Sequence, residues 1–299
     1  MTRALVVGRI RRGRPIEPMV ATVRDSLRAA GWQVDGKVVR RKGAMTRRAA
    51  KAVAAGCDVV VVVGGDGAVL RVASALADSK ATLGIIPAGT GNLLAGNLGI
   101  PKHRGRATRT ILGGHTRRID LGRVTVEGAH RDFAVACGVG FDARVVRATG
   151  TREKLRWGRL AYFAHVLRQS ANIHNVEHEL VLDGVTSTMD AAQVFVANFG
   201  RMLPFMAPQL PVEPDDGMLD VVVVRASGPM SALLAGWEAL RQGDVGESDA
   251  GHVYRARARE VTIRTTPPRL VEADGSVVGT TPVTVTVLPG ALTVLVPAS

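Results

Sequence analysis

A run of β-branched residues that ends in a cluster of glycines constrains this fold more than any other feature. Residues 59–63 are all valine, a pattern typical of a strand buried on both faces. The next four residues are Gly64-Gly65-Asp66-Gly67, which permit positive φ angles and a close approach to a ligand. Residues 68–77 then carry apolar side chains at helical spacing, so the glycines precede a helix. The free N–H groups of a helix N-terminus favour an anion.

A second unit of the same kind follows. The predicted strand 83–86 leads into the turn 87–92, whose letters are PAGTGN, and then into a short helix. Two such units open at the carboxyl ends of neighbouring strands, where a crevice suited to a polyphosphate forms. Asp66 lies inside the first turn, and a carboxylate beside phosphates implies a bridging cation, for which Mg²⁺ is the expected ion.

The order of predicted elements divides the chain. Strands at 4–7, 33–39 and 59–63 alternate with helices at 18–30 and 44–55, which predicts a parallel sheet covered by helices. From residue 119 onward short strands separated by turns predict a β-sandwich or flattened barrel. They are expected at 119–126, 132–138, 176–182, 193–197, 219–224, 261–264, 283–288 and 292–296. We therefore predict an α/β domain over 1–118 and a β-sandwich domain over 119–299, whose last roughly 10–15 residues can pack back on the first domain.

The charge of the chain favours acidic partners. Lys and Arg number 39 against 26 Asp and Glu, and residues 1–50 alone hold 13 basic and 3 acidic side chains. Such a field attracts nucleic acid, anionic lipid surfaces or nucleotides. With only 11 aromatic residues a base-stacking platform is not expected, so we predict no nucleic-acid partner. The alternative is that a GC-rich genome simply enriches arginine.

Other features of the sequence concern the protein's location, disulfide bonds and metal ligands. No run of 18 apolar residues occurs, and the N-terminus lacks the pattern of a signal peptide, so a cytoplasmic location is expected. Two cysteines, Cys57 and Cys137, give neither a disulfide framework nor a zinc cluster. His174 and His178 are spaced like metal ligands, but the neighbouring glutamates favour a polar surface.

The glycine turns carry a family resemblance. The motifs GGDG at 64–67, PAGTGN at 87–92 and LGIP at 98–101 resemble the catalytic domain of the diacylglycerol and sphingolipid kinase family, which is related to the NAD kinases. The segments PDDGMLD at 214–220, TP at 281–282 and LPGAL at 288–292 extend the resemblance. It implies ATP and Mg²⁺ as cofactors. It also implies a nucleotide site at Gly64, Gly65, Asp66, Gly67, Ala68, Gly89, Thr90, Gly91 and Asn92.

The resemblance implies two further sites. A cation would be held by the main-chain carbonyls of Glu213 and Met218 and the carboxylate of Asp216, although Asp-Asp-Gly is also an ordinary turn. The family's general base is the Glu of a DGE motif, and Ser276 stands at that position here. Asp274 is then the leading candidate base, with Asp66 on the metal–phosphate side. Glu272 is a second candidate if residues 272, 274 and 276 face one side of an extended strand.

The resemblance therefore implies a lipid kinase. The expected activity transfers the γ-phosphoryl group of ATP to a hydroxyl of diacylglycerol, a sphingoid base or a related lipid, at a membrane surface to which the protein binds peripherally. The resemblance also implies a homodimer. The alternative is an impaired family member that binds nucleotide or lipid in a regulatory role, which the departures Ala68, Leu70, Arg71 and Ser276 favour. An amphipathic helix predicted at 153–170 either leans on a bilayer or covers the sandwich.

Overall fold

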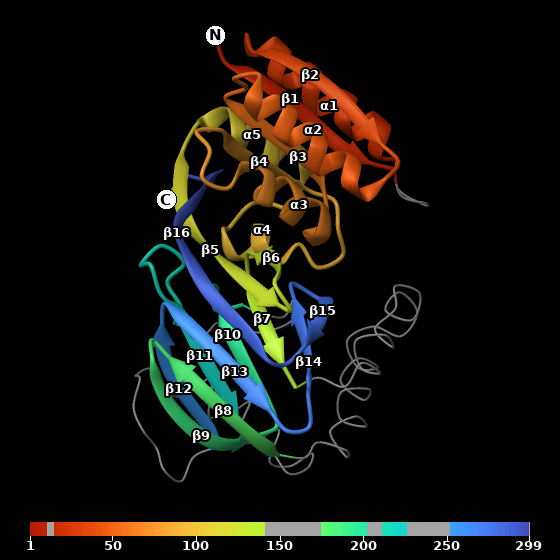
Figure 1. Cartoon of the computed structure of the whole chain (residues 1–299). Helices are drawn as coiled ribbons and strands as arrows, with labels where there is room; N and C mark the ends of the chain where they lie inside the picture. The colour runs from red at the N-terminus through yellow and green to blue at the C-terminus, as the bar shows by residue number, and fades with distance from the viewer. Residues whose placement is uncertain (11–14, 141–174, 202–210, 226–251, 299) are drawn as a thin grey trace, which may run out of the picture. The chain divides into compact units, whose positions relative to one another are not determined.

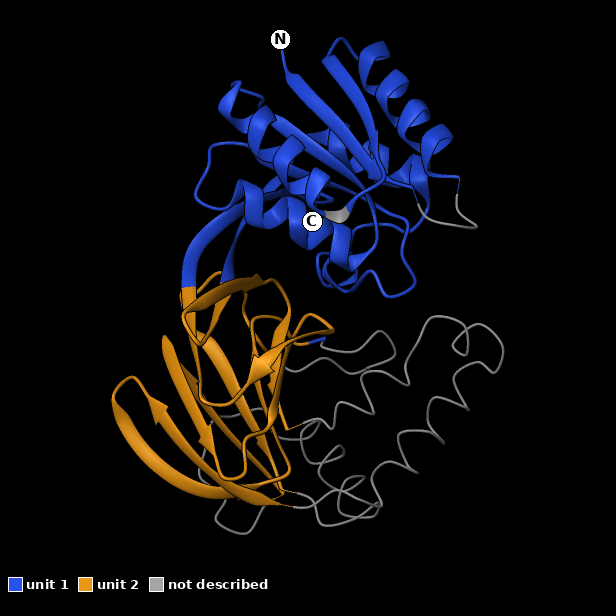
Figure 2. Cartoon of the chain, turned by 45° about the vertical axis from the view of Figure 1, so that its right-hand side comes forward, with its two compact units in different colours: residues 1–121, 201–206, 288–299 blue, residues 122–200, 207–287 orange. Residues whose placement is uncertain are grey.

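The structure is a computed structural model that describes residues 1–10, 15–140, 175–201, 211–225 and 252–298, and it contains two compact units (Figures 1 and 2). The first unit holds residues 1–121, Arg201 and the end of the chain from Leu288. The second unit begins at Gly122 and ends at Val287. The helix predicted at 153–170 lies outside the described residues. Among the described helices, none is long and apolar enough to cross a membrane.

The first unit is a parallel sheet with helices on both faces. Its strands are β1 (Arg3–Arg9), β2 (Gln33–Val39), β3 (Val59–Gly64) and β4 (Thr82–Pro87). Its helices are α1 (Ile16–Ala29), α2 (Lys42–Ala54), α3 (Asp66–Leu76), α4 (Leu93–Asn97) and α5 (Arg104–Gly113). The strand order is β2-β1-β3-β4, all parallel, and β4 also pairs in parallel with the C-terminal part of β16 (Val283–Leu295) through Val294.

Burial explains this layering. Every residue of β3 is buried, as its unbroken valine run predicts for a central strand. Helix α1 contacts α5, and α2 contacts α3, so the helices form a layer on each face of the sheet. The chain moves outward from β1 to β2 and in the opposite direction from β3 to β4. The carboxyl ends of β1 and β3, where Gly8 is registered with Val63, therefore form a topological switch point of the kind at which ligands bind.

The second unit is built from two antiparallel sheets. Its strands are the second part of β5 (Thr116–Val126), β6 (Ala129–Phe133), β7 (Ala136–Val139), β8 (Val176–Leu182), β9 (Val185–Ala191), β10 (Gln193–Ala197), β11 (Leu219–Val224), β12 (Val253–Ala258), β13 (Glu260–Thr265), β14 (Leu270–Ala273) and β15 (Ser276–Thr280), with the first part of β16. One sheet contains β16-β13-β8-β9, and the other has the order β12-β11-β10-β7-β14-β15.

Alternating apolar residues of both sheets fill one core. Val194, Val196, Val221 and Val223 face inward from β10 and β11, and Ile263 faces them from the other sheet, all at 0% exposure. This alternation of inward and outward side chains is that of a β-sandwich. The predicted fold class, an α/β unit followed by a β-sandwich, is confirmed.

Three predicted strands have other bounds in the structure. The strand predicted at 132–138 is two strands, β6 and β7, because the backbone between them turns to donate hydrogen bonds to the Asp274 carboxylate. The two strands predicted on either side of Pro289-Gly290 are one, β16. There Gly290 takes a φ of 54° and its N–H donates to Asp120, so the strand continues through the expected break.

His178 corrects the expectation of a polar surface around that residue. Its side chain is fully buried in β8, whereas His174 lies outside the described residues. The ring Nδ1 lies 2.8 Å from the carbonyl of Val176, which can only accept, so Nδ1 carries the proton. Nε2 is buried without a hydrogen-bond partner among the described atoms. Burial is the main cause that lowers the pKa of His178, so the folded protein holds the ring neutral.

This burial makes stability dependent on pH. Because the folded-state pKa is lowered, the stabilisation is complete above the unfolded value of 6.5 and is lost as the pH falls through the folded-state value. The slope approaches about 1.4 kcal/mol per pH unit for one proton. We expect the variant His178→Leu to have an unfolding free energy that depends less on pH between pH 6.5 and the onset of carboxylate titration. Urea unfolding at a series of pH values measures this, and an unchanged slope would contradict it.

Candidate functional site

The two glycine turns are in direct backbone contact. Gly65 follows β3 and Gly89 follows β4, whose last residues Gly64 and Pro87 are paired. A Cβ added to Gly65 would lie 2.7 Å from Cα of Gly89, and one added to Gly89 would lie 2.5 Å from Cα of Gly65. No side chain fits at either position. The expectation of positive φ in these turns was wrong for Gly64, Gly65, Gly67 and Gly89. Gly64, Gly65 and Gly89 are needed for close approach instead.

A carboxylate joins the same two turns. Asp66, the first residue of α3, accepts a hydrogen bond from the N–H of Asn92 at 2.8 Å and a second, at 2.5 Å, from the N–H of Leu93. Asn92, at a φ of 52°, closes its own turn: its Oδ1 accepts from the N–H of Gly89 and its Nδ2 donates to the Gly89 carbonyl. The position of the second turn is thus fixed from the first.

The start of α3 is the part of this arrangement that a ligand can reach. Gly67 is exposed, and a Cβ there would meet only the guanidinium of Arg71, at 3.4 Å. The first N–H groups of a helix have no acceptor within the helix, so those of Asp66 and Gly67 are placed to receive an anion. Arg71 bends back to donate to the Gly67 carbonyl and brings a positive charge to the same turn. Leu70 is buried beneath it.

These residues fit a phosphate and, in part, a cation. Both oxygens of Asp66 already accept an N–H, but each carboxylate oxygen can accept a second contact. Of the other predicted nucleotide-site residues, Thr90 is exposed at the turn tip, whereas Gly64 is buried and Ala68 packs against it. The structure therefore brings together the predicted residues of both turns.

The predicted cation loop belongs to the second unit and is engaged by protein groups. Asp216 accepts a hydrogen bond from the N–H of Met218 at 2.9 Å, which makes the ordinary turn that the sequence also allowed. Its other oxygen forms an ion pair with Arg257. Arg257 also lies 3.9 Å from Asp220, which is itself paired with the buried Arg255 at 3.2 Å. A cation at Asp216 would compete with the guanidinium of Arg257, so in this conformation the carboxylate does not fit a metal.

The predicted catalytic hairpin is a tight turn rather than an extended strand. Asp274 and Gly275, at φ 45° and 73°, form the two-residue loop between β14 and β15, with Ala273 opposite Ser276. The Asp274 carboxylate accepts hydrogen bonds from the N–H groups of Ala134, Val135 and Ala136 at 2.8–3.1 Å. It thereby holds the hairpin to the chain before β7.

This turn overturns the idea that residues 272, 274 and 276 share a face. Glu272 is opposite Val277 in the hairpin, so it lies on the other face from Ser276, which is paired with the buried Ala273. Among the described residues no hydrogen bond or ion pair reaches the half-buried Glu272 carboxylate. Burial raises the pKa of Glu272, and the neighbouring Asp274 raises it further.

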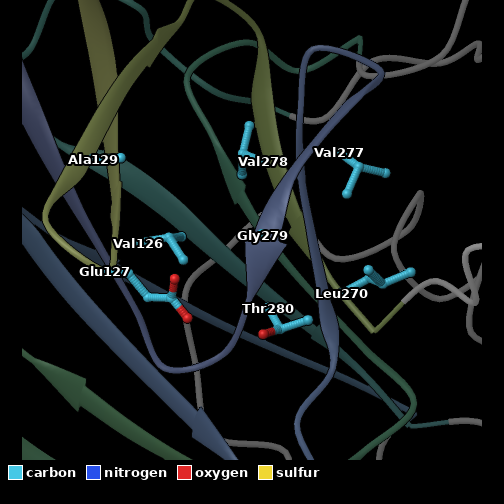
Figure 3. Close-up of a pocket in the computed structure, with 8 residues that line it drawn as sticks. All are labelled: Val126, Glu127, Ala129, Leu270, Val277, Val278, Gly279 and Thr280. Carbon is cyan, nitrogen blue, oxygen red and sulfur yellow. The ribbon is translucent and has the colours of Figure 1, made fainter.

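An open surface pocket of about 330 Å³ lies along β15 in the second unit (Figure 3). In the view of Figure 3, Leu270 and Val277 extend to one side of the strand, and Val126 and Glu127 lie on the other. Val277 is 44% exposed, and it is the cross-strand neighbour of Glu272. The lining is mostly apolar and includes no basic side chain, which suits a hydrocarbon group better than a phosphate.

Comparison with known proteins identifies this arrangement. Residues 13–124 match the family described as the diacylglycerol kinase catalytic domain. Residues 135–296 match the YegS C-terminal NAD kinase beta sandwich-like domain. The architecture is thus that of a two-domain kinase. The chain belongs to the diacylglycerol kinase family, within which these two domains follow one another.

Individual relatives agree with this. A diacylglycerol kinase of Mycobacterium tuberculosis is 33% identical over 83% of this chain and 80% of its own length. An uncharacterized protein of Synechocystis is 30% identical over 81% of this chain, and the match spans only 55% of that protein. The crystal structure of a putative diacylglycerol kinase from Bacillus anthracis superposes with a TM-score of 0.81 over 98% of this chain and 95% of its own, at 24% identity, which shows the shared fold.

The sequence did not reveal how its two glycine motifs are connected. The Gly65–Gly89 contact and the bonds from Asp66 to the backbone of Asn92 and Leu93 depend on strand neighbours that only the sheet order defines. The available signal was that both turns follow buried strands and precede helices.

Two glycine substitutions separate packing from ligand contact. Gly65→Ala forces its methyl group into Gly89 and should lower the unfolding free energy by about 1–3 kcal/mol. Gly67→Ala meets only a flexible guanidinium, so it should leave the melting temperature unchanged. Its methyl covers the exposed helix start, so it should weaken ATP binding by about tenfold or more, as the loss of one charge-assisted hydrogen bond would.

Thermal melting and calorimetric ATP titration of both variants make this comparison. Gly43→Ala is the matched control, because a Cβ there also meets only an arginine side chain, at 3.5 Å, on a different helix. Equal ATP affinity in Gly67→Ala and the wild type would place the nucleotide elsewhere.

Proposed function

We propose that the protein is an ATP- and Mg²⁺-dependent lipid kinase that phosphorylates a hydroxyl of diacylglycerol, a sphingoid base or a related lipid. The observation that carries the proposal is the pair of glycine turns held in contact at the carboxyl ends of β3 and β4, next to the switch point between β1 and β3. It supplies an exposed helix start beside a carboxylate, which is what a nucleotide triphosphate with its cation requires. The family membership and the name of the M. tuberculosis relative support the lipid acceptor.

The residues of the first unit bind and orient in this proposal. The N–H groups at the start of α3 and at Gly91 hold phosphate oxygens, since those of Gly89 and Asn92 already donate to Asn92 and Asp66. Asp66 faces the cation while its backbone bonds keep the turns together. Bound Mg²⁺ would offset the charge that develops on the transferred phosphoryl group. Glu213, Asp216 and Met218 take a cation only if Arg257 moves away from Asp216.

The first experiment measures turnover of radiolabelled ATP with mixed vesicles of diacylglycerol and sphingosine. We expect label in a lipid product for the wild type. Asp66→Asn keeps a side-chain oxygen that accepts one backbone N–H but removes the charge. We therefore expect it to fold and to lose at least about 100-fold in kcat. Absence of a labelled lipid, with ATP binding retained in calorimetry, would leave the regulatory alternative instead.

The proton of the acceptor hydroxyl needs a base, and Glu272 has the better environment for it. The Asp274 oxygens accept three backbone N–H groups, whereas no described group engages the carboxylate of Glu272. A carboxyl whose pKa is raised is also a stronger proton acceptor once it is ionised. In the proposed step the hydroxyl proton passes to Glu272, the alcohol oxygen bonds to the γ-phosphorus, and the bond to the leaving ADP oxygen breaks.

Substitution of Glu272 tests this role. We expect Glu272→Gln to lower kcat by about 10²–10⁴-fold and to abolish the acidic limb of its pH profile, with a smaller effect on KM. Because the folded-state pKa of Glu272 is raised, its contribution to stability falls as the pH rises from the usual 4.5 through the folded-state value. The glutamine variant should therefore be at least as stable at neutral pH, so that unfolding cannot explain the loss.

Ser276→Glu is the counterpart, because it restores the residue that the family resemblance places there. A large gain in kcat for this variant, together with little loss in Glu272→Gln, would show that the protein lacks an effective base. That result would favour the impaired, ligand-binding member of the family.

A further inference from the structure

Helix α2 presents a basic face on the surface of the first unit. Ala44, Arg47, Arg48 and Lys51 surround a surface hollow of about 340 Å³. Their spacing of three, four and seven residues places them on one side of the helix. The helix is anchored by other positions, since Met45 and Ala49 are fully buried. Arg40 and Arg41, just before the helix, are exposed as well. We call these five cations, Arg40, Arg41, Arg47, Arg48 and Lys51, the basic face.

The charges of the basic face are unbalanced. In the described part of the chain none of the five side chains has a hydrogen bond or ion pair, and α2 contains no acidic residue. Arg47 and Lys51 are like charges one turn apart, which weakens a helix slightly. Arg41, at the N-cap, opposes the helix dipole. Among the described residues these cations therefore make no hydrogen bond or ion pair that stabilises the fold, whereas an external anion would relieve their repulsion.

The surroundings of the basic face favour a lipid surface over a nucleic acid. Neither α2 nor the two arginines before it include an aromatic side chain, so the bases of a nucleic acid would have no stacking partner here. Beside it, Ile10 donates its N–H to the carbonyl of Val39, the last residue of β2, at 2.9 Å. Its side chain is 38% exposed. An apolar side chain at the edge of a group of cations suits the boundary between headgroups and acyl chains.

We propose that the basic face docks the protein on the anionic phosphate headgroups of the membrane that supplies its lipid substrate. The inference rests on the proposed lipid kinase activity for its purpose, but not for its measurement. Binding through this face is electrostatic, because no large apolar side chain of α2 is among the exposed ones in the described residues. It therefore weakens steeply as salt is added.

The test is sedimentation of the full chain with phosphatidylcholine vesicles that contain or lack phosphatidylglycerol. We expect binding only to the anionic vesicles. The variant Arg47→Gln/Arg48→Gln/Lys51→Gln should bind them about 100-fold more weakly, because each surface cation contributes roughly a factor of five. The matched control is Arg104→Gln/Arg106→Gln/Arg109→Gln, which removes three exposed cations from α5 of the same unit. We expect it to bind like the wild type, and equal losses in both variants would overturn the proposal.

Two further measurements distinguish membrane docking from the proposed kinase activity. With lipid presented in neutral detergent micelles, the α2 variant should phosphorylate as fast as the wild type, and on anionic vesicles it should be slower. If the protein has no kinase activity, the sedimentation result still decides the docking proposal. Retention of vesicle binding by the α2 variant, or binding of the basic face to a short DNA duplex but not to vesicles, would overturn it.

Discussion

The contact between Gly65 and Gly89 is the constraint on which the first unit's site depends. Parallel pairing brings the ends of β3 and β4 together, but a side chain at either glycine would force the following turns apart. Asp66 then makes the contact specific, since its carboxylate bonds the backbone N–H groups of Asn92 and Leu93 at the start of α4. A buried or half-buried carboxylate destabilises the fold unless such donors compensate its lost hydration. One acidic residue thus sets the relative position of two helix starts.

Much of this fold could be predicted from local patterns. The valine run of β3 and the alternating strands of the sandwich have burial periods that a single sequence displays, and β2, β8, β10 and β11 begin and end where the pattern indicates. Errors arose where a distant partner decides the conformation. Pro289-Gly290 looks like a strand end, yet the N–H of Gly290 finds an acceptor in Asp120, 170 positions away.

The candidate site shows the same division. The sequence identifies the glycines of the two turns, but it does not show why glycine is required there. A positive φ angle and a close backbone approach both favour glycine, so the sequence cannot distinguish them. Asp274 and Glu272 differ in a way that no local pattern encodes. Asp274 starts a two-residue turn that brings its carboxylate to the backbone N–H groups of residues 134–136, whereas Glu272 stays in the strand. His178 is flanked by glutamates in the sequence, which suggests an exposed position, but the alternation of side chains along β8 places it in the core.

The carboxylates of the second unit differ in their capacity to act as a base in place of the glutamate of the family motif. A carboxylate that accepts several backbone N–H bonds is held in place by them. Asp274 is in that state, and Asp216 is matched by Arg257. Glu272 differs from both, since it is half-buried, next to a second negative charge, and unbonded within the described residues. Such an unbonded carboxylate lowers the stability of the fold. Groups of this kind occur most often at functional sites, where a ligand interacts with them. Glu272, rather than Asp274, is therefore the residue whose replacement is most informative about proton transfer.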